Sequence, residues 1–186
     1  MPAVVPFRRI LWVKSVSMDE GELAYSGRPG QRFDLHSTPE DADSLQDPEV
    51  GDLVVLTQHD QVTHLVKIVG ERVEERPRRS IKKGTRDERF TVQRTCEHVF
   101  VRPVAEAPFV DEAFGCAPDT TGGETLRIED LAAVKASDQP MWMVQRRILN
   151  AVEGPSFSAL FVKRSHHEDD GMPKMELSEF LRGHEV

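Results

Sequence analysis

Cysteine and histidine stand two residues apart at Cys96 and His98, a spacing that suits a nucleophile and its general base. On a β-strand such residues share a face, so the thiol and the imidazole would lie side by side. A cysteine on an apolar strand is more often a buried structural residue, and we favour that interpretation. The sequence contains neither a glycine-rich phosphate loop nor a nucleophile elbow. We therefore predict no catalytic residues and keep an enzyme using Cys96 and His98 as the last of three hypotheses.

Residues 166–170 (HHEDD) are of the types that bind metal ions. Adjacent residues in a polar segment do not converge easily on one ion, and no second cluster completes the set. We predict a solvated tail at this position, and neither a metal nor a cofactor for the chain.

Residues 72–94 form a basic segment in an acidic chain. The net charge of −8 argues against a large, non-specific nucleic-acid binder, but this segment holds nine basic residues against four acidic ones. Such a surplus can hold phosphates by counterion release, whereas charge runs more often form only a solvated loop. If the segment does track a phosphate backbone, its contacts come from Arg78, Arg79, Lys82 and Lys83.

The residues that carry chemistry must be positioned by strands. Residues 53–57 and 62–69 read as an antiparallel hairpin, because two Val-rich apolar runs flank a polar turn over residues 58–61. Residues 10–14 predict a first strand, with Trp12 on one face and Leu11 and Val13 on the other. Residues 90–101 predict a further strand with a bulge between Cys96 and Val99. We expect at least four strands between residues 8 and 103, and irregular structure with only short helical pieces over residues 17–50.

The second part of the sequence predicts helices. Residues 128–135 fit a short helix, and residues 140–152 fit a longer one with Asp138 as its cap and Gly154-Pro155 as its end. Its core stripe is Met141, Val144, Ile148 and Ala151 or Val152. We expect a loop over residues 103–124, a last strand over 157–162 and a terminal helix over 177–181.

Length and composition indicate one domain over residues 1–155 with an extension over 156–186. The chain has 186 residues, of which 38% are hydrophobic, enough for one core. No apolar run approaches the roughly 18 residues that span a bilayer, and residues 1–6 do not read as a secretory signal. The two cysteines form no CxxC pair. We expect reduced thiols and a cytoplasmic protein.

Several short motifs resemble the EVE branch of the PUA-like superfamily. These are residues 12–15 (WVKS), 51–58 (GDLVVLTQ) with 62–66 (VTHLV), and the loop 25–32 (YSGRPGQR). Residues 13–19 also resemble the opening strand of the related YTH domain. The resemblance covers about residues 8–103. It implies an α+β fold, a small curved β-barrel with flanking helices, and here a C-terminal helical extension. Members commonly read a modified or flipped base, and some resemble sensors attached to defence enzymes.

The resemblance implies an aromatic-walled pocket. A flipped base needs a flat stacking surface and a few groups that hydrogen-bond to its edges. Trp12 is the first wall, with Tyr25 or Phe33 facing it, although Trp12 could equally be a core residue and His64 an ordinary strand histidine. The expected ligand contacts are Trp12, Lys14, Ser15, Tyr25, Arg28, Gln31, Arg32, His59, Thr63 and His64.

The leading hypothesis is a non-catalytic module that recognises a modified nucleobase or nucleotide, free or in nucleic acid. The alternative is a protein-interaction or regulatory subunit that uses the acidic second part of the chain, where residues 104–186 hold 8 basic and 15 acidic residues. The positions of Trp12, Tyr25 and Arg28 discriminate the two. A shared cleft beside the basic segment favours nucleic acid, whereas dispersal into core and surface favours the interaction protein.

Overall fold

The computed structural model describes residues 5–16, 22–81, 86–120 and 123–154. Internal contacts divide the chain into Met1–Gly154 and Pro155–Val186, and only the first unit falls among the described residues. The strand expected over 157–162, the helix expected over 177–181 and the polar segment 166–170 lie outside them. So do Lys82 and Lys83 of the basic segment.

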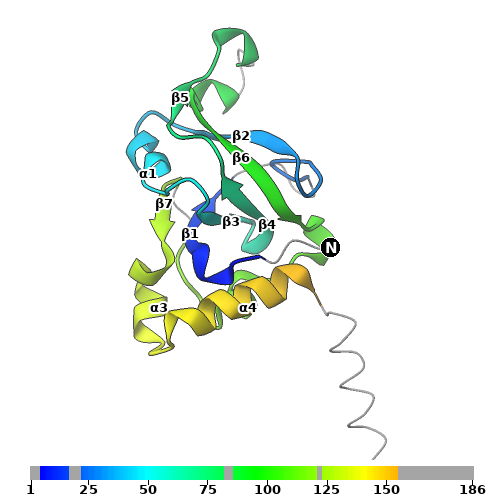
Figure 1. Cartoon of the computed structure of the whole chain (residues 1–186), viewed down its shortest axis with the longest axis vertical. Helices are drawn as coiled ribbons and strands as arrows, with labels where there is room; N and C mark the ends of the chain where they lie inside the picture. The colour runs from blue at the N-terminus through cyan, green and yellow to red at the C-terminus, as the bar shows by residue number, and fades with distance from the viewer. Residues whose placement is uncertain (1–4, 17–21, 82–85, 121–122, 155–186) are drawn as a thin grey trace, which may run out of the picture. The chain divides into compact units, whose positions relative to one another are not determined.

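A curled, mixed, seven-stranded sheet forms a half-barrel with a few helices around it, which confirms the α+β class (Figure 1). The strand order is β2-β6-β4-β3-β1-β7, and β5 pairs with β6. Strands β1 and β3 are parallel, and the other pairs are antiparallel. The strands are β1 (Ile10–Ser15), β2 (Arg32–Ser37), β3 (Leu53–Gln58), β4 (Gln61–Ile68), β5 (Glu74–Glu75), β6 (Val92–Val101) and β7 (Thr125–Arg127).

The hairpin β3–β4 confirms the strongest strand prediction. All six residues of β3 are buried, as its continuous apolar run requires. The turn is shorter than expected, because Gln58 and Gln61 pair with each other and leave two residues to reverse the chain. These are His59 and Asp60, with φ of 50° and 59°. Two successive residues with positive φ match the twist of the flanking strands.

The first strand is present, but the face predicted for Leu11 is wrong. The pairing of β1 with β3 shifts register between Ile10 and Trp12, so Leu11 is an extra residue in β1. Ile10 and Val13 therefore pack in an apolar cluster on one face of the sheet, while Leu11 joins Trp12 in a second apolar cluster on the opposite face.

Two further elements correct or confirm the sequence predictions. The prediction of irregular structure over residues 17–50 is wrong for β2, which forms a strand there. Phe33 and Leu35 alternate with polar residues along this strand, which pairs with β6. The bulge predicted in β6 is confirmed. Leu65 pairs with Phe100 and Val66 with His98, which leaves Val99 unpaired.

The helices are short except for the last one. They are α1 (Ala42–Gln46), α2 (Val110–Phe114), α3 (Ala132–Ala136) and α4 (Met141–Glu153). Helix α4 and its buried stripe confirm the prediction, whereas the loop expected over 103–124 contains α2, and residues 128–135 divide into a 3-10 turn (Ile128–Asp130) and α3. The predicted cap is wrong. Asp138 adopts φ of 51°, and Pro140 is the N-cap residue, with no side-chain hydrogen bond to the helix.

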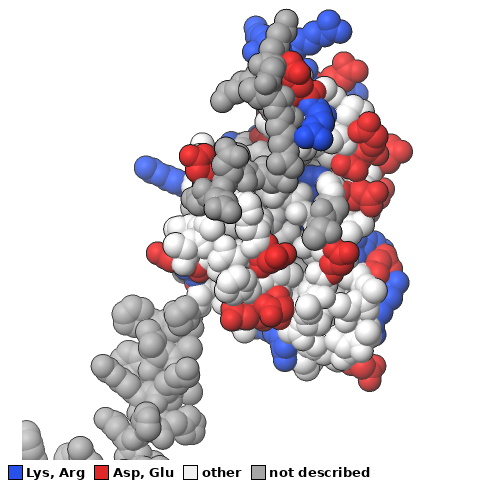
Figure 2. Space-filling view, turned by 180° about the vertical axis from the view of Figure 1, so that it is seen from behind, with Lys and Arg blue, Asp and Glu red and all other residues white. Residues whose placement is uncertain are grey.

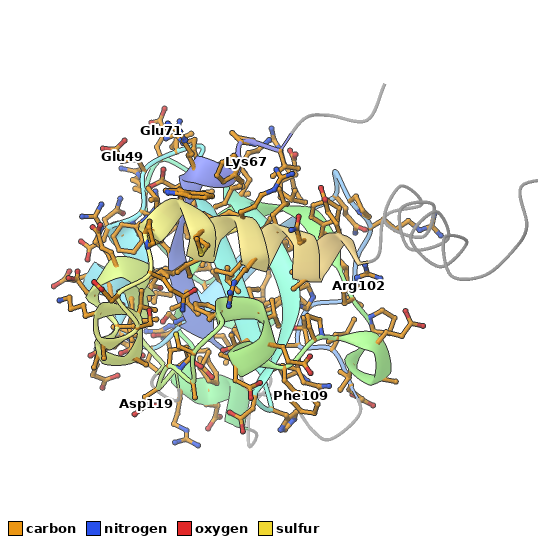
Figure 3. All side chains as sticks on the ribbon, turned by 90° about the horizontal axis from the view of Figure 1, so that it is seen from below. Glu49, Lys67, Glu71, Arg102, Phe109 and Asp119 are labelled. Atoms are coloured by element: carbon orange, nitrogen blue, oxygen red, sulfur yellow. The ribbon has the colours of Figure 1, made fainter. Side chains whose placement is uncertain are left out.

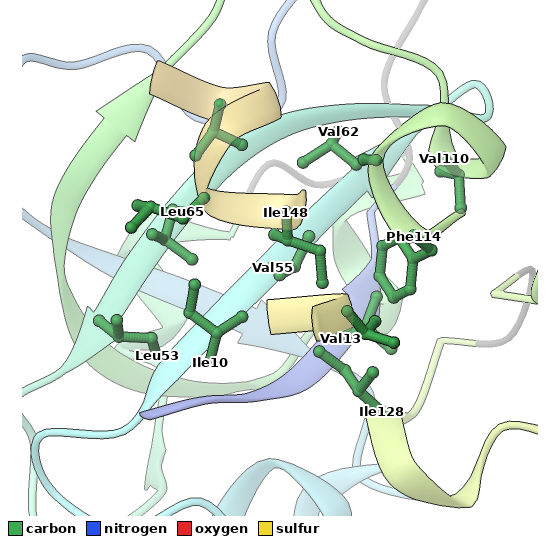
Figure 4. Close-up of a cluster of buried hydrophobic side chains, with 14 of the residues drawn as sticks. Ile10, Val13, Leu53, Val55, Val62, Leu65, Val110, Phe114, Ile128 and Ile148 are labelled. Carbon is green, nitrogen blue, oxygen red and sulfur yellow. The ribbon is translucent and has the colours of Figure 1, made fainter. Parts of the chain in front are cut away.

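Two apolar clusters lie on opposite faces of the sheet. On the outer face, Ile148 of α4 and Phe114 of α2 pack against Val13, Val55 and Leu65 (Figure 4). Helix α4 crosses this face when the molecule is seen from below (Figure 3). The inner cluster includes Trp12, Leu35, Val54, Leu56, Val66, Ile68 and Cys96.

Candidate ligand-binding site

The sheet is curled, and its inner, concave face is recognised by a contact between two strands that are not neighbours in the sheet. The Lys14 ammonium on β1 donates a hydrogen bond of 3.1 Å to Ser37 Oγ on β2, although β3, β4 and β6 separate these strands. The sheet therefore curls until the two side chains meet inside it. Trp12 stands two residues before Lys14 and projects to the same side.

Trp12 is held firmly within the inner cluster. Its indole is 6% exposed, and Nε1 donates a hydrogen bond of 3.0 Å to Asp52 Oδ2. The other Asp52 oxygen accepts a bond of 3.0 Å from Arg9. The Asp52 carboxylate therefore holds the pyrrole edge of the indole in place, and Arg9 in turn holds the carboxylate.

A groove of about 390 Å³ lies beside Trp12, between α1 and β7. Its lining residues come from β1, α1, β7 and the turn after β7. They are Trp12, Ser44, Asp47, Glu124, Thr125, Leu126, Arg127, Asp130 and Leu131. The volume falls within the range of about 300–1,000 Å³ that small-ligand sites occupy.

Arg127 covers the indole. Trp12 and Arg127 are directly opposite each other on β1 and β7, so their side chains share a face. The Arg127 guanidinium carbon lies 5.2 Å from the centre of the Trp12 ring, a cation–π geometry. The Arg127 side chain is 46% exposed and forms a 3.0 Å ion pair with Glu129. The indole is therefore covered by the half-exposed side chain of Arg127, whose backbone is held in the β1–β7 ladder.

Thr125 is the polar residue at the base of the groove. Its backbone N–H donates to Ser44 Oγ at 3.0 Å, which joins β7 to α1. Its own hydroxyl is buried and has no hydrogen-bond partner among the described residues. Leaving a buried hydroxyl unsatisfied costs free energy, so this oxygen would gain from a partner. It has almost no accessible surface, so the neighbouring side chains must shift before a ligand in the groove reaches it.

Lys14 is a buried cation next to the groove, opposite Thr125 in the β1–β7 pairing. Its ammonium donates to Ser37 Oγ and to the Gly123 carbonyl. Burial lowers the pKa of Lys14 to about 8, against the attraction of Asp41 and Glu124, which raises it. A lysine with such a pKa in a polar cluster often marks a functional region.

A second cluster of rings lies elsewhere on the same face. Tyr25 lies 4.9 Å from Phe33 and 6.5 Å from His64, measured between ring centres. His98 stacks on Phe33 at 4.1 Å with an interplanar angle of 13°, and on His64 at 5.6 Å. The Tyr25 carbonyl accepts a hydrogen bond of 2.6 Å from His64 Nε2, while His64 Nδ1 pairs with Thr63 Oγ1 at 2.9 Å.

This cluster is closed. A Cβ at Gly27 would overlap the His98 ring, so the chain segment before β2 lies directly against it. Both His98 ring nitrogens are buried and have no partner among the described residues. Cys96 is completely buried, its thiol donates to the Arg94 carbonyl, and burial raises its pKa to about 12. The thiol and the imidazole are therefore not hydrogen-bonded, and the thiolate that nucleophilic attack requires is disfavoured.

The ten ligand contacts expected from the sequence fall into separate places. Trp12 and Lys14 share the groove side of the inner face, whereas Tyr25, Thr63 and His64 belong to the ring cluster. Ser15 is half-buried at the end of β1. The remaining four are exposed, three of them before or at the start of β2 and one in the hairpin turn: Arg28, Gln31, Arg32 and His59.

Arg78 and Arg79 of the basic segment do not line the groove, although Arg94 at the end of this segment donates to the Leu45 and Gln46 carbonyls in α1. Arg78 and Arg79 are exposed in a 3-10 turn (Arg78–Ser80) after β5. Figure 2 shows basic side chains at the end of the molecule that carries β5 in Figure 1, and acidic side chains along the edge that carries α1. The two charge types are thus partly segregated on this face.

Sequence reasoning missed most of the groove. Thr125 and Arg127 lie on a three-residue strand that no periodicity reveals. Glu124 directly precedes this strand, and Asp47 follows a five-residue helix. The one groove residue that the sequence did indicate was Trp12, which it placed on one face of the first strand and named as a wall of a binding pocket.

A comparison with models of protein families finds no match, and a comparison with curated proteins finds none either. No helix in the described part of the chain is long and apolar enough to cross a membrane. Within the same residues, no group of three or more His, Cys, Asp or Glu side chains could hold a metal ion.

Proposed function

We propose that this chain is a non-catalytic recognition module, of the EVE-like, PUA-like kind, whose groove beside Trp12 binds a nucleobase or nucleotide. The observation that carries the proposal is the groove itself. It has the volume of a small-ligand site, it is lined by Trp12, whose indole is covered by the movable Arg127 side chain, and it is also lined by Thr125, whose buried hydroxyl has no partner among the described residues. A flat stacking surface and a few hydrogen-bonding groups are what a base requires.

The lining groups suit the edge of a base better than its phosphate. The carboxylates of Asp47, Glu124 and Asp130 accept hydrogen bonds and repel anions. Carboxylates pair with exocyclic amino groups, as they do with the amino group of cytosine. The base would therefore enter the groove with its sugar and phosphate directed outward.

The first test is calorimetric titration of the chain with a panel of natural and modified nucleosides. We expect binding by at least one ring that bears an amino group, and a loss of affinity in Thr125→Val, because the methyl group that replaces the hydroxyl cannot pair with the ligand. Thr91→Val, half-buried before β6, is the control and should leave affinity unchanged. If no nucleoside binds the unmodified chain, the proposal is wrong.

If the ligand is part of a nucleic acid, the basic segment supplies phosphate contacts. Arg78→Glu with Arg79→Glu should then weaken oligonucleotide binding equally for all sequences. Each lost contact should reduce the slope of log affinity against log salt by about 0.9 on duplex DNA. Salt-dependent binding assays measure this slope.

A matched control for this experiment is available on α4. Arg146→Glu with Arg147→Glu changes two exposed arginines and the net charge by the same amount, on the face covered by the helix. We expect this control to keep the slope of the unmodified chain. Equal effects of the two double variants would show that only net charge matters and that the segment after β5 is a solvated loop.

A second candidate function, a protein-interaction module, has two observations in its favour. The first is that Trp12, Tyr25 and Arg28 lie in separate places rather than in one cleft. The second is that the groove already holds a guanidinium over its indole, so an arginine or lysine of a partner protein would find the same surroundings. A basic peptide that competes for the groove while every nucleoside fails would favour this function.

A further inference from the structure

The space over Trp12 has a marked preference for positive charge. Aromatic faces carry negative partial charge and attract cations, and the indole is the strongest of them. The chain places its own planar cation there, the Arg127 guanidinium, 5.2 Å from the ring centre. The position of Arg127 therefore shows that the space over Trp12 accommodates a planar cation.

The groove keeps a net negative charge when Arg127 leaves it, although Lys135 pairs with Asp130 and Lys14 attracts Glu124. Among the described residues, its lining then contains the carboxylates of Asp47, Glu124 and Asp130 and no basic side chain. Lys135 pairs with Asp130 at 3.0 Å from the surface, and Lys14 is directed to Ser37 and Gly123 behind the groove. A neutral ring would gain the stacking contact alone, whereas a cationic ring would also gain attraction to the carboxylates.

Arg127 can leave without disturbing the sheet. Its backbone pairs with Trp12 in the β1–β7 ladder, but its side chain is held by an ion pair with Glu129 in which both partners are about half exposed, at 46% and 52%. Exposed ion pairs of this type contribute little, so rotation of the side chain into solvent is easy.

We propose that the groove selects nucleobases that carry a positive charge, the class that ring N-methylation produces in 7-methylguanine and 1-methyladenine, and that such a base displaces the Arg127 guanidinium from Trp12. This inference rests on the proposed function, because it names the ligand class of the same groove. The Thr125 hydroxyl and the carboxylates hydrogen-bond to the edge of the ring.

The test compares nucleosides that differ by one methyl group and one charge. Calorimetric titrations near neutral pH pair 7-methylguanosine with guanosine and 1-methyladenosine with adenosine. We expect the cationic member to bind about tenfold more tightly, the range of a desolvated cation–π contact. Added salt should weaken the cationic member more than the neutral one, because only the cation interacts with the carboxylates.

Variants separate charge from shape. Asp47→Asn with Glu124→Gln keeps the size of both side chains. It should remove the preference for the charged member of each pair, whatever its effect on the affinity for the neutral member. Arg127→Ala should raise the affinity for the cationic nucleosides, because it removes the competing guanidinium. Arg72→Ala, an exposed arginine beside β5, is the matched control and should change nothing.

The outcomes are distinct. Equal affinity for charged and neutral members of each pair overturns this inference and leaves the proposed function intact. Failure of every nucleoside overturns both. Binding of an arginine- or lysine-containing peptide in place of nucleosides also overturns both, in favour of the interaction module. An unchanged preference in the Asp47→Asn, Glu124→Gln variant overturns the role of the carboxylates and with it the inference.

Discussion

Replacing Trp12 by alanine is expected to lower the free energy of unfolding by about 3–5 kcal/mol, the usual cost of removing a large aromatic side chain from a core. The indole is 6% exposed, packs in the inner cluster and donates to Asp52. Its removal leaves both a cavity and a carboxylate oxygen with one partner fewer. Urea or thermal unfolding of Trp12→Ala measures the loss.

Trp12→Phe separates the core role of this residue from its binding role. Phenylalanine keeps most of the packing but presents a smaller and less negative face to a ligand. If a base stacks on Trp12, we expect nucleoside affinity to fall while most of the stability remains, by up to the roughly 1–3 kcal/mol that one base–aromatic stack contributes. Titration and unfolding are measured on the same preparation.

The second tryptophan provides the control. Trp142 is 53% exposed on α4 and does not line the groove, so Trp142→Phe should alter neither property. A large loss of stability in Trp12→Phe with unchanged affinity in the folded fraction would make Trp12 a core residue only. That result would remove the main support for nucleobase recognition.

The elements that could be predicted were those with a strong local pattern. The hairpin β3–β4 has two Val-rich runs and a polar turn, and α4 has apolar residues at helical spacing ended by a glycine. Strand β2 was missed because it has six residues and only Phe33 and Leu35 mark its buried side. Its strand state comes from pairing with β6, which lies some sixty residues further on.

The candidate site was predictable only on its β1 side. The alternation of residues along a strand places Trp12 and Lys14 on one face, as the structure shows. The opposite wall comes from β7, more than a hundred residues later, and its charge could not be inferred without the fold. The bulge at Leu11 is a further limit, because a register shift depends on the partner strand rather than on the local sequence.

The ring cluster shows a different limit. The sequence singled out Tyr25 and His64 as ligand contacts, and the structure does bring them together. It also adds Phe33 and His98, and the chain segment around Gly27 lies directly against the His98 ring. Residue type indicated that these side chains could hydrogen-bond to a ligand, but packing decided that they bond to one another and to the backbone.

Acid is expected to destabilise the fold strongly through the two histidines of this cluster. The pKa of His64 is lowered from its ordinary 6.5 to about 4, mainly by burial. The hydrogen bond to the Tyr25 carbonyl opposes this shift, and the charge of His98 adds to it. Burial also lowers the pKa of His98. Between pH 6.5 and about pH 4, the ordinary and the lowered pKa of His64, the unfolded chain binds more protons than the folded one. The free energy of unfolding therefore falls as the pH falls.

The size of the effect follows from the shift. For His64 alone, a pKa lowered from 6.5 to about 4 corresponds to about 3 kcal/mol, fully present above pH 6.5 and lost progressively toward pH 4. No carboxylate contacts the His98 ring among the described residues. Its neighbours there are Phe33, His64 and the chain at Gly27, and Cys96 on the same strand remains a neutral thiol. An imidazolium formed at His98 would therefore lack a counter-charge.

Unfolding in urea at a series of pH values between neutral and about pH 4.5 measures this dependence, and variants isolate the histidines from the carboxylates that also titrate. His98→Gln and His64→Gln replace each ring by a neutral amide, so each should lower stability at neutral pH but flatten its decrease in acid. His59→Asn is the control. His59 is exposed in the hairpin turn with a φ of 50°, which asparagine tolerates, so this variant should keep the slope of the unmodified chain. Parallel curves for all three variants would show that the carboxylates alone govern acid unfolding, and that the two imidazoles bind protons equally in the folded and unfolded chain.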